Sequence, residues 1–286
     1  MKLTRREALG VMGAAAVTAP FAGKALAAEA KPTKGIALQL YTMRDPAKED
    51  LAGTLKKCRE IGFEYVQWSG MPDLPADKIR AELDAAGLKA IACHTSVEQF
   101  EKDFEGSVAF WKTVGVQFAG PGGMMGDCQK DLASWLKGCK RFDAVGAKMR
   151  EAGLHLTYHN HAGEFEKFEG DDRCKLDILY AETKPENVLA ELDLAWVRVG
   201  GADPAAYIRK YKNRCLTVHA KDLTADSTKG KVQFTPLGKG SLNWDDIFAA
   251  GKEAGIQWYI YEQDDTGGDP FGCAKTSFEF LASKLL

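Results

Sequence analysis

The sequence predicts a single (β/α)8 barrel of the α/β class. Eight short apolar runs alternate with amphipathic helical stretches, and strands that alternate with helices form parallel sheets with both faces covered. Of the 286 residues, 259 follow position 27, which suits one closed barrel, and we see no domain boundary among them. No G-x-G-x-x-G follows the first apolar run, which argues against an open dinucleotide-binding sheet.

The first 27 residues are predicted to be a twin-arginine signal peptide. The pair Arg5 and Arg6 precedes an apolar, Ala/Gly-rich run at 8–22, and an A-L-A sequence ending at Ala27 has the pattern of a cleavage site. A membrane anchor is the alternative, but the run is short for a helix that spans a bilayer. We therefore expect export by the twin-arginine machinery and a periplasmic mature protein.

The mature chain is predicted to be soluble and mildly acidic. Residues 28–34 form a polar leader, and the barrel occupies 35–286. The signal carries four basic residues and one acidic residue, so its removal changes the formal net charge from −2 to about −5. An acidic chain without a basic stripe is a poor nucleic-acid binder, and no later stretch reaches the ~18 apolar residues of a spanning helix. We expect neither nucleic acid nor, after processing, a membrane as a partner.

Glycines and Asp-Pro pairs mark the ends of the predicted elements. A glycine follows a helical stretch and precedes an apolar run at positions 62, 87, 115, 153 and 255, because glycine adopts the left-handed conformation after a helix at little cost. Asp-Pro at 45–46, 203–204 and 269–270 is typical of helix starts, with Asp as the cap. These marks place eight strands near 35–41, 64–68, 88–94, 116–119, 154–159, 188–193, 215–220 and 257–262.

The fifth predicted strand ends in a cluster of ionisable side chains. The stretch L-H-L-T-Y-H-N-H-A-G-E-F runs from Leu154 to Phe165. In an extended chain His159 and His161 share one face, and Glu164 follows three residues later. Imidazoles and a carboxylate are ligands for divalent metal ions, although a single histidine in a strand is more often a hydrogen-bonded core residue.

Three later strands end in the same kinds of residue. Asp193, His219 and Glu262 close the sixth, seventh and eighth apolar runs. The chemistry of (β/α)8 barrels lies at the carboxyl ends of the strands, and a buried carboxylate is costly unless it is paired or bound to a metal. Oxygen and imidazole ligands predict one divalent ion, which we expect to be manganese, with Mg²⁺, Co²⁺ or Zn²⁺ as alternatives. A salt-bridge network with basic side chains such as Lys221 is the other interpretation.

These motifs make the chain similar to the xylose isomerase-like TIM-barrel superfamily, in its sugar phosphate isomerase/epimerase branch. The resemblance covers the whole mature chain. Its most specific parts are Q-L-Y-T-M-R-D at 39–45, Y-H-N-H-A-G-E-F at 158–165, L-D-L-A-W at 192–196, H-A-K-D at 219–222 and Y-E-Q-D at 261–264. The resemblance implies a single TIM barrel and an enzyme of carbohydrate metabolism.

The resemblance also implies four metal ligands, a Glu, an Asp, a His and a Glu, from the last four strands. Asp193, His219 and Glu262 match the last three positions. Many relatives end the fifth strand with the ligand Glu, whereas this chain has His159 there. Either His159 or His161 replaces that ligand, or Glu164 folds back from the loop, and we favour Glu164.

The implied chemistry is proton abstraction next to a carbonyl. A metal that bridges a carbonyl and a neighbouring hydroxyl of a sugar acidifies the intervening C–H by stabilising a metal-bound enediolate. One group removes the proton and a second returns it, and Glu164 and Glu262 are the predicted pair, with His161 or His159 as the rival base. Lys221 is predicted to hold the oxyanion, and a supporting or surface lysine is the alternative.

Side chains from the other strand ends are predicted to bind the sugar ring. Aromatic faces stack on sugars and polar tips hydrogen-bond to hydroxyls, but core packing explains such residues equally well. The predicted substrate-binding residues are Gln39, Tyr41, Trp68, His94 and Trp196.

The expected function is that of an exported, divalent-metal-dependent sugar isomerase or epimerase. Trp196 stands where sugar epimerases often have a histidine, which weakens a simple epimerase assignment. Loss of a β-substituent from the same intermediate gives a lyase or dehydratase, and relatives with an H-N-H fifth strand include dehydratase-like and keto-glycoside-cleaving enzymes. A non-catalytic periplasmic sugar-binding protein is the third interpretation.

Overall fold

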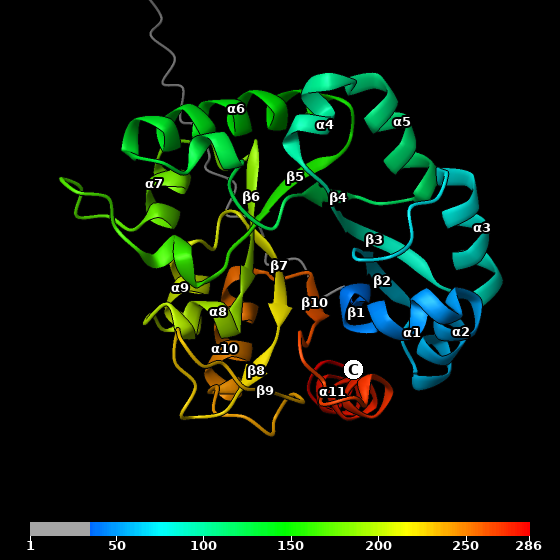
Figure 1. The fold of residues 1–286 in the computed structure, drawn as a ribbon. Helices are drawn as coiled ribbons and strands as arrows, with labels where there is room; N and C mark the ends of the chain where they lie inside the picture. The colour runs from blue at the N-terminus through cyan, green and yellow to red at the C-terminus, as the bar shows by residue number, and fades with distance from the viewer. Residues whose placement is uncertain (1–34) are drawn as a thin grey trace, which may run out of the picture.

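The computed structural model describes residues 35–286 as a closed barrel of parallel strands with helices around it (Figure 1). The strand order is β1-β10-β7-β6-β5-β4-β3-β2, which confirms the predicted single (β/α)8 barrel. The predicted signal peptide and leader lie outside the described residues. The barrel strands are β1 (Gly35–Gln39), β2 (Tyr65–Trp68), β3 (Lys89–His94), β4 (Phe118–Gly120), β5 (His155–His159), β6 (Val188–Asp193), β7 (Cys215–Ala220) and β10 (Trp258–Tyr261).

Helices follow the strands and cover the outside of the barrel (Figure 1). They are α1 (Arg44–Glu49), α2 (Leu51–Ile61), α3 (Ala76–Ala86), α4 (Val97–Lys102), α5 (Phe104–Val114), α6 (Leu132–Glu151), α7 (Lys175–Ala181), α8 (Leu194–Val199), α9 (Pro204–Lys210), α10 (Trp244–Ala254) and α11 (Pro270–Leu285). Within the described part of the chain, none of these helices has the length and apolarity needed to cross a membrane.

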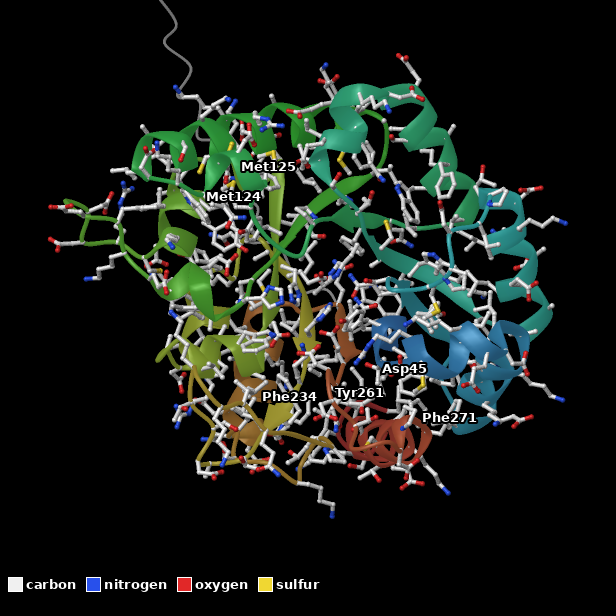
Figure 2. All side chains as sticks on the ribbon, in the orientation of Figure 1. Asp45, Met124, Met125, Phe234, Tyr261 and Phe271 are labelled. Carbon is white, nitrogen blue, oxygen red and sulfur yellow. The ribbon has the colours of Figure 1, made fainter. Side chains whose placement is uncertain are left out.

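Short elements line the carboxyl end of the barrel. Three 3-10 turns are η1 (Leu40–Met43), η2 (Gly126–Cys128) and η3 (Ala162–Phe165). The two short strands β8 (Asp222–Leu223) and β9 (Phe234–Thr235) pair antiparallel after β7. Phe234 of β9 lies near the barrel mouth, where its ring is 5.3 Å from the ammonium of Lys221 (Figure 2).

The predicted element ends agree with the structure, with one exception. All five junction glycines have positive φ, from 72° at Gly87 to 127° at Gly62, and a Cβ at Gly62 would collide with Phe278. The Asp203 and Asp269 side chains cap α9 and α11 as expected. The expectation for Asp45 was wrong: this residue lies inside α1, because η1 runs directly into that helix and leaves no separate cap.

The interior of the barrel has an apolar lower part and a polar upper part. Side chains alternate faces along a strand, so Leu189, Glu191 and Asp193 of β6 all point inward, from the amino end to the carboxyl end. The apolar cluster below contains Ala37, Ile91, Ala92, Phe118, Leu189, Trp258 and Ile260. The buried polar side chains above it include Gln39, Gln67, His159, Glu191, Asp193, Thr217 and His219.

Candidate metal centre and active site

Four ligand-type side chains meet at the carboxyl ends of β5, β6, β7 and β10. His159, Asp193, His219 and Glu262 each offer one atom, and these four atoms all lie within 4.8 Å of one another. His219 Nδ1 is 2.8 Å from Glu262 Oε2, and His159 Nε2 is 3.8 Å from Asp193 Oδ2. We call these four residues the upper group. Of the metal ligands expected from the sequence, it contains Asp193, His219 and Glu262.

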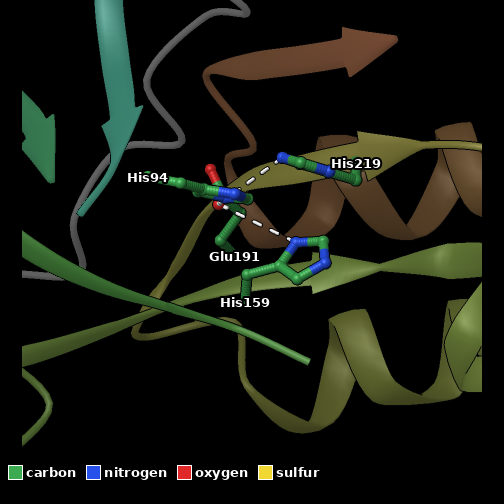
Figure 3. Close-up of side chains that lie close together, drawn as sticks. All are labelled: His94, His159, Glu191 and His219. Carbon is green, nitrogen blue, oxygen red and sulfur yellow. Dashed lines mark hydrogen bonds and ion pairs between the residues drawn. The ribbon is translucent and has the colours of Figure 1, made fainter. Parts of the chain in front are cut away.

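A second cluster lies deeper in the barrel and shares two residues with the upper group. This lower group consists of His94, His159, Glu191 and His219 (Figure 3). Glu191 Oε2 is 2.9 Å from His94 Nε2, 3.5 Å from His219 Nε2 and 3.9 Å from His159 Nδ1. The shared imidazoles of His159 and His219 therefore turn one ring nitrogen towards each group.

Lys221 places a positive charge beside the upper group. Its side chain is buried, and Nζ lies 2.9 Å from Asp193 Oδ2 and 2.7 Å from Glu262 Oε2. Asp264 is a third partner at 3.1 Å. Part of the salt-bridge interpretation is therefore present, because the ammonium compensates two carboxylates that would be costly to bury alone.

Charges of opposite sign stabilise each other below the barrel mouth. Burial by itself would lower the pKa of His219, but the carboxylates of Glu191 and Glu262 outweigh it and raise that pKa to about 10. Burial would likewise raise the pKa of Glu191, and the charges and hydrogen bonds of His219 and His94 lower it overall. Opposite charges within a few ångströms favour the charged form of both partners.

The pKa values of His159 and Lys221 are shifted in opposite directions. Burial, together with the neighbouring His219 and His94 imidazoles, holds the pKa of His159 well below its usual value. Its imidazole is thus neutral, which is the form that binds metal ions. The carboxylates around Lys221 outweigh burial and raise the pKa of its ammonium.

The upper group has donors that fit a divalent metal ion. Two imidazoles and two carboxylates are the nitrogen and oxygen ligands that Mn²⁺, Co²⁺ and Zn²⁺ accept. Among the described residues, Asp193 Oδ2 of this group is buried without a hydrogen-bond partner and has the Lys221 ammonium as its ion-pair partner, so it can accept a further ligand. The His, Asp and Glu side chains here could therefore bind a metal.

A cavity of about 310 Å³ opens beside these residues and reaches the surface. Of the residues that we expected to bind substrate or carry out catalysis, Tyr41, His94, His159, His161, Lys221 and Glu262 line it. Gly122, in the loop after β4, also lines it, and a Cβ there would lie 3.8 Å from each of the rings of His94, His159 and His161. The three imidazoles therefore face one space beside Gly122.

Glu164 lies outside both groups, although from the sequence we favoured it as the metal ligand that follows the fifth strand. Glu164 Oε1 accepts a hydrogen bond from the Tyr158 hydroxyl, and Oε2 accepts one from the His161 backbone N–H, each at 2.9 Å. These bonds hold η3 together, because its turn needs an acceptor for its free N–H groups. At the end of β5, His159 instead joins Asp193, His219 and Glu262.

The remaining expected substrate-binding residues lie around the cavity rather than in it. Gln39 is fully buried and donates to Gln67 Oε1 at 3.0 Å. Trp68 lines a neighbouring cavity of about 590 Å³, whose wall also includes His94. The Trp196 ring packs 5.5 Å from the His161 ring and 5.7 Å from the Lys221 ammonium.

Glu191 and Gln67 are parts of the site that the sequence did not reveal. Gln67 Nε2 donates to both carboxylate oxygens of Glu191 at 3.1 Å, and Gln67 Oε1 accepts from His219 Nε2 at 2.6 Å. The available signal was the spacing of two between Glu191 and Asp193, which puts both side chains on one face of β6. An acid two positions before a strand end was not distinguishable from ordinary strand sequence.

Comparison with known proteins places these observations in a family. The model of the xylose isomerase-like TIM barrel matches residues 55–284. A sugar phosphate isomerase/epimerase from Parabacteroides distasonis ATCC 8503 superimposes with a TM-score of 0.73 and 21% identity, over 91% of this chain and 96% of that chain. The IOLI protein with a bound zinc atom superimposes with a TM-score of 0.65 and 16% identity, over 88% of this chain and 99% of that chain.

Curated sequence relatives match over a shorter length. An inosose dehydratase of Lacticaseibacillus casei is 24% identical over 167 residues, or 53% of this chain and 55% of that protein. Inosose dehydratase 1 of Bacillus cereus is 26% identical over 166 residues, or 52% of this chain and 54% of that protein. The chain thus spans about half the length of the curated relatives it matches. Because the family model covers most of the barrel, the chain belongs to the xylose isomerase-like TIM barrel family.

Proposed function

We propose that this protein is a divalent-metal-dependent sugar isomerase or epimerase, which removes a proton from the carbon next to a carbonyl. The observation that carries the proposal is the upper group, which opens onto a cavity lined by further imidazoles and by Lys221. A cavity of this size lies at the small end of ligand pockets and suits one sugar ring.

His159, Asp193, His219 and Glu262 would hold the metal. When bound, a divalent ion supplies Lewis-acid polarisation of the substrate carbonyl, and manganese is the ion we expect. The protein orients at least one ligand firmly, because His219 Nε2 donates to Gln67 Oε1 while Nδ1 faces the upper group. Such outer partners fix the ring orientation of ligating histidines.

Charge stabilisation and proton transfer fall to side chains on the cavity wall. Lys221 is the candidate for holding the negative charge that develops on the substrate oxygen, because it is a positively charged side chain that lines the cavity. His161 is a candidate for moving the proton, since its ring lines the cavity and its backbone is held by Glu164. Both oxygens of Glu164 are engaged, so we assign Glu164 a supporting role in place of ligand or base.

Elimination is the second candidate, and the sequence relatives favour it. The curated proteins that match this chain are named inosose dehydratases. Proton removal next to a carbonyl is common to both reactions, and a leaving group on the next carbon then departs instead of the proton returning. Isomerisation and elimination therefore use the same side chains up to that step.

Solvent exchange in deuterated water tests the proposal. Metal-replete protein is incubated with free ketoses, an inosose and a 3-keto-glycoside, and the products are followed by NMR. Deuterium in a recovered sugar identifies an isomerase or epimerase, whereas a new C=C bond or a released group identifies a lyase. Binding of a sugar without exchange from any of these compounds would contradict both candidates and favour a sugar-binding protein.

We also propose that the protein is exported by the twin-arginine machinery to the periplasm, on the basis of Arg5, Arg6 and the apolar run that follows. Replacing both arginines, Arg5→Lys with Arg6→Lys, should leave unprocessed protein in the cytoplasm. Cell fractionation followed by immunoblotting measures this, and normal periplasmic accumulation of the double variant would overturn the assignment.

A further inference from the structure

A buried carboxylate–imidazole pair lies beside the cavity and has no role in the chemistry described so far. His94 ends β3, Glu191 lies on β6, and His94 Nε2 is 2.9 Å from Glu191 Oε2 (Figure 3). The Glu191 side chain is 0% exposed, whereas the His94 side chain is 17% exposed. His94 lines both the 310 Å³ cavity and the neighbouring 590 Å³ cavity.

The Glu191 carboxylate is held in place by amides. Gln67 Nε2 donates to both of its oxygens at 3.1 Å, and Gln39 Nε2 donates to Gln67 Oε1 at 3.0 Å. Gln39 and Gln67 are themselves fully buried, so this chain of amides cannot relax into solvent. A carboxylate fixed in this way fixes the ring that it bonds.

The hydrogen-bond network assigns the tautomer of His94. Both Glu191 oxygens accept hydrogen bonds from Gln67 Nε2, so His94 Nε2 donates the hydrogen bond that it shares with Glu191. In the neutral imidazole the other nitrogen, Nδ1, then carries the lone pair. It lies 3.8 Å from the point where a Cβ at Gly122 would be, and Gly122 lines the cavity. The lone pair is therefore available at the cavity.

We propose that His94 is a catalytic residue that transfers the substrate proton, and that Glu191 is the positioning residue that orients it. The inference rests on the proposed proton abstraction and adds the group that carries it out. His161 Cε1 also lies 3.8 Å from the Gly122 Cβ position, so two imidazoles face the same space, as return of the proton by a second group requires.

The step is a simple proton transfer. The Nδ1 lone pair of His94 takes the proton from the carbon next to the carbonyl, and the C–H electron pair forms the C=C bond while the carbonyl oxygen gains the negative charge. The imidazolium then carries a proton on each nitrogen, and the Glu191 carboxylate stabilises it. This is the arrangement in which an acid orients and supports a histidine base. The proton afterwards returns to carbon or leaves with the departing oxygen.

Chemical rescue tests the role of His94. The variant His94→Ala leaves a ring-sized gap at the cavity, so added imidazole can take its place. With the substrate that exchanges in the wild type, we expect His94→Ala to keep its metal but to exchange about 10²–10⁴-fold more slowly. Imidazole should restore the rate at least in part. His155→Ala, at the opposite end of β5, is the control: it should exchange at the wild-type rate, and added imidazole should not alter that rate.

Glu191→Gln tests the positioning role. Its side-chain amide can donate to Nε2, which would favour the Nδ1–H tautomer of His94. We expect two-dimensional ¹H–¹⁵N NMR of the histidine rings to show that change without loss of metal, and imidazole to leave the slowed exchange unaltered because the ring still fills its place.

Three outcomes with His94→Ala would overturn the inference. Wild-type exchange in His94→Ala would remove the proton-transfer role, and so would a loss that imidazole cannot restore. Loss of the metal from His94→Ala would make this histidine a ligand instead. If the wild-type protein exchanges no substrate, the proposed function fails and this inference fails with it. If the wild type and His94→Ala exchange substrate at the same rate, only the inference about His94 fails, and the proposed function stands.

Discussion

The ammonium of Lys221 lies 2.7–2.9 Å from two carboxylates that would also bind a metal ion. Two cations cannot be equally close to both acids without repulsion, so we expect that a bound metal ion would shift Lys221 towards its third partner, Asp264. In the metal-free protein Lys221 therefore serves as the compensating charge for Asp193 and Glu262. We therefore propose that Lys221 and a bound metal ion would compete for the same pair of acids.

This competition predicts how Lys221→Met behaves. Without metal, the variant leaves two buried carboxylates uncompensated, and we expect it to be less stable by about 3–5 kcal/mol. Added Mn²⁺ or Zn²⁺ should raise its melting temperature by more than it raises that of the wild type, because the ion replaces the missing charge. Thermal unfolding with and without metal measures both effects.

The matched control is Lys56→Met, because the Lys56 side chain is 75% exposed and its ion pair on α2 is worth little. Its stability should stay within about 0.5 kcal/mol of the wild type. Equal metal-induced shifts in wild type and Lys221→Met would show that lysine and metal do not compete.

Gly122 gives a second prediction at the scale of one residue. A methyl group there would meet three imidazoles at ordinary contact distance, so Gly122→Ala should fold normally but occupy the space that faces them. We expect kcat/KM to fall by roughly 10–200-fold, the effect of one misplaced methyl group in a pocket. Steady-state kinetics measures the loss of kcat/KM, and thermal unfolding shows whether the variant folds as stably as the wild type.

Gly126→Ala is the control for that substitution, since a Cβ at Gly126 meets nothing within 4 Å and lies in the same loop between β4 and α6. Unchanged kinetics in Gly122→Ala, with both variants equally stable, would mean that substrate does not enter between the imidazoles.

The positions of some residues of the site could be predicted from the sequence, and those of others could not. Asp193, His219 and Glu262 could be predicted to meet, because parallel barrel strands bring their carboxyl ends to one edge. Glu164 could not be placed, because its position depends on a 3-10 turn that two of its own hydrogen bonds create. The partnership of Glu191 with His94 joins strands 97 residues apart and follows from barrel closure, which no local pattern encodes.

At the scale of elements, the segment from β5 through η3 determines which side chain completes the upper group. His159 is the last residue of β5 and points into the barrel, whereas Glu164 is turned back onto Tyr158 and the His161 backbone. The strand therefore supplies the imidazole of His159 to the upper group.

This geometry predicts opposite effects for two substitutions. His159→Ala should lose most of its metal, because it removes one of four ligands. Glu164→Gln should keep the metal but lose about 1–3 kcal/mol of stability, because an amide cannot accept at both former oxygens. Equilibrium dialysis and denaturant unfolding measure the two quantities. Metal loss in Glu164→Gln with retention in His159→Ala would return the ligand role to Glu164.

Element boundaries were predictable where one residue type sets the local conformation. Each of the five glycines after helices has the positive φ that favours glycine and so marks a helix end. Each barrel strand begins and ends within about two residues of its expected position. Asp45 failed because its Asp-Pro pair follows η1 without a break, so the helix start is set by the preceding turn.

At the scale of the whole molecule, the division of the barrel interior decides where chemistry can occur. The lower interior is filled by an apolar cluster that includes Phe118, Trp258 and Ile260. The polar side chains gather above it, at the end where the cavity opens. The fold class followed from element order and chain length, but the composition of the two interior halves required the register between strands.

The central claim is that the polar end of the barrel binds one divalent ion per chain. The most direct measurement is elemental analysis by mass spectrometry of protein that has been loaded separately with Mn²⁺, Co²⁺ and Zn²⁺ and then dialysed. We expect close to one equivalent with at least one of these ions, and a large loss in Asp193→Ala and His219→Ala. No bound ion from any of the three, in protein that is folded by circular dichroism, would contradict the account.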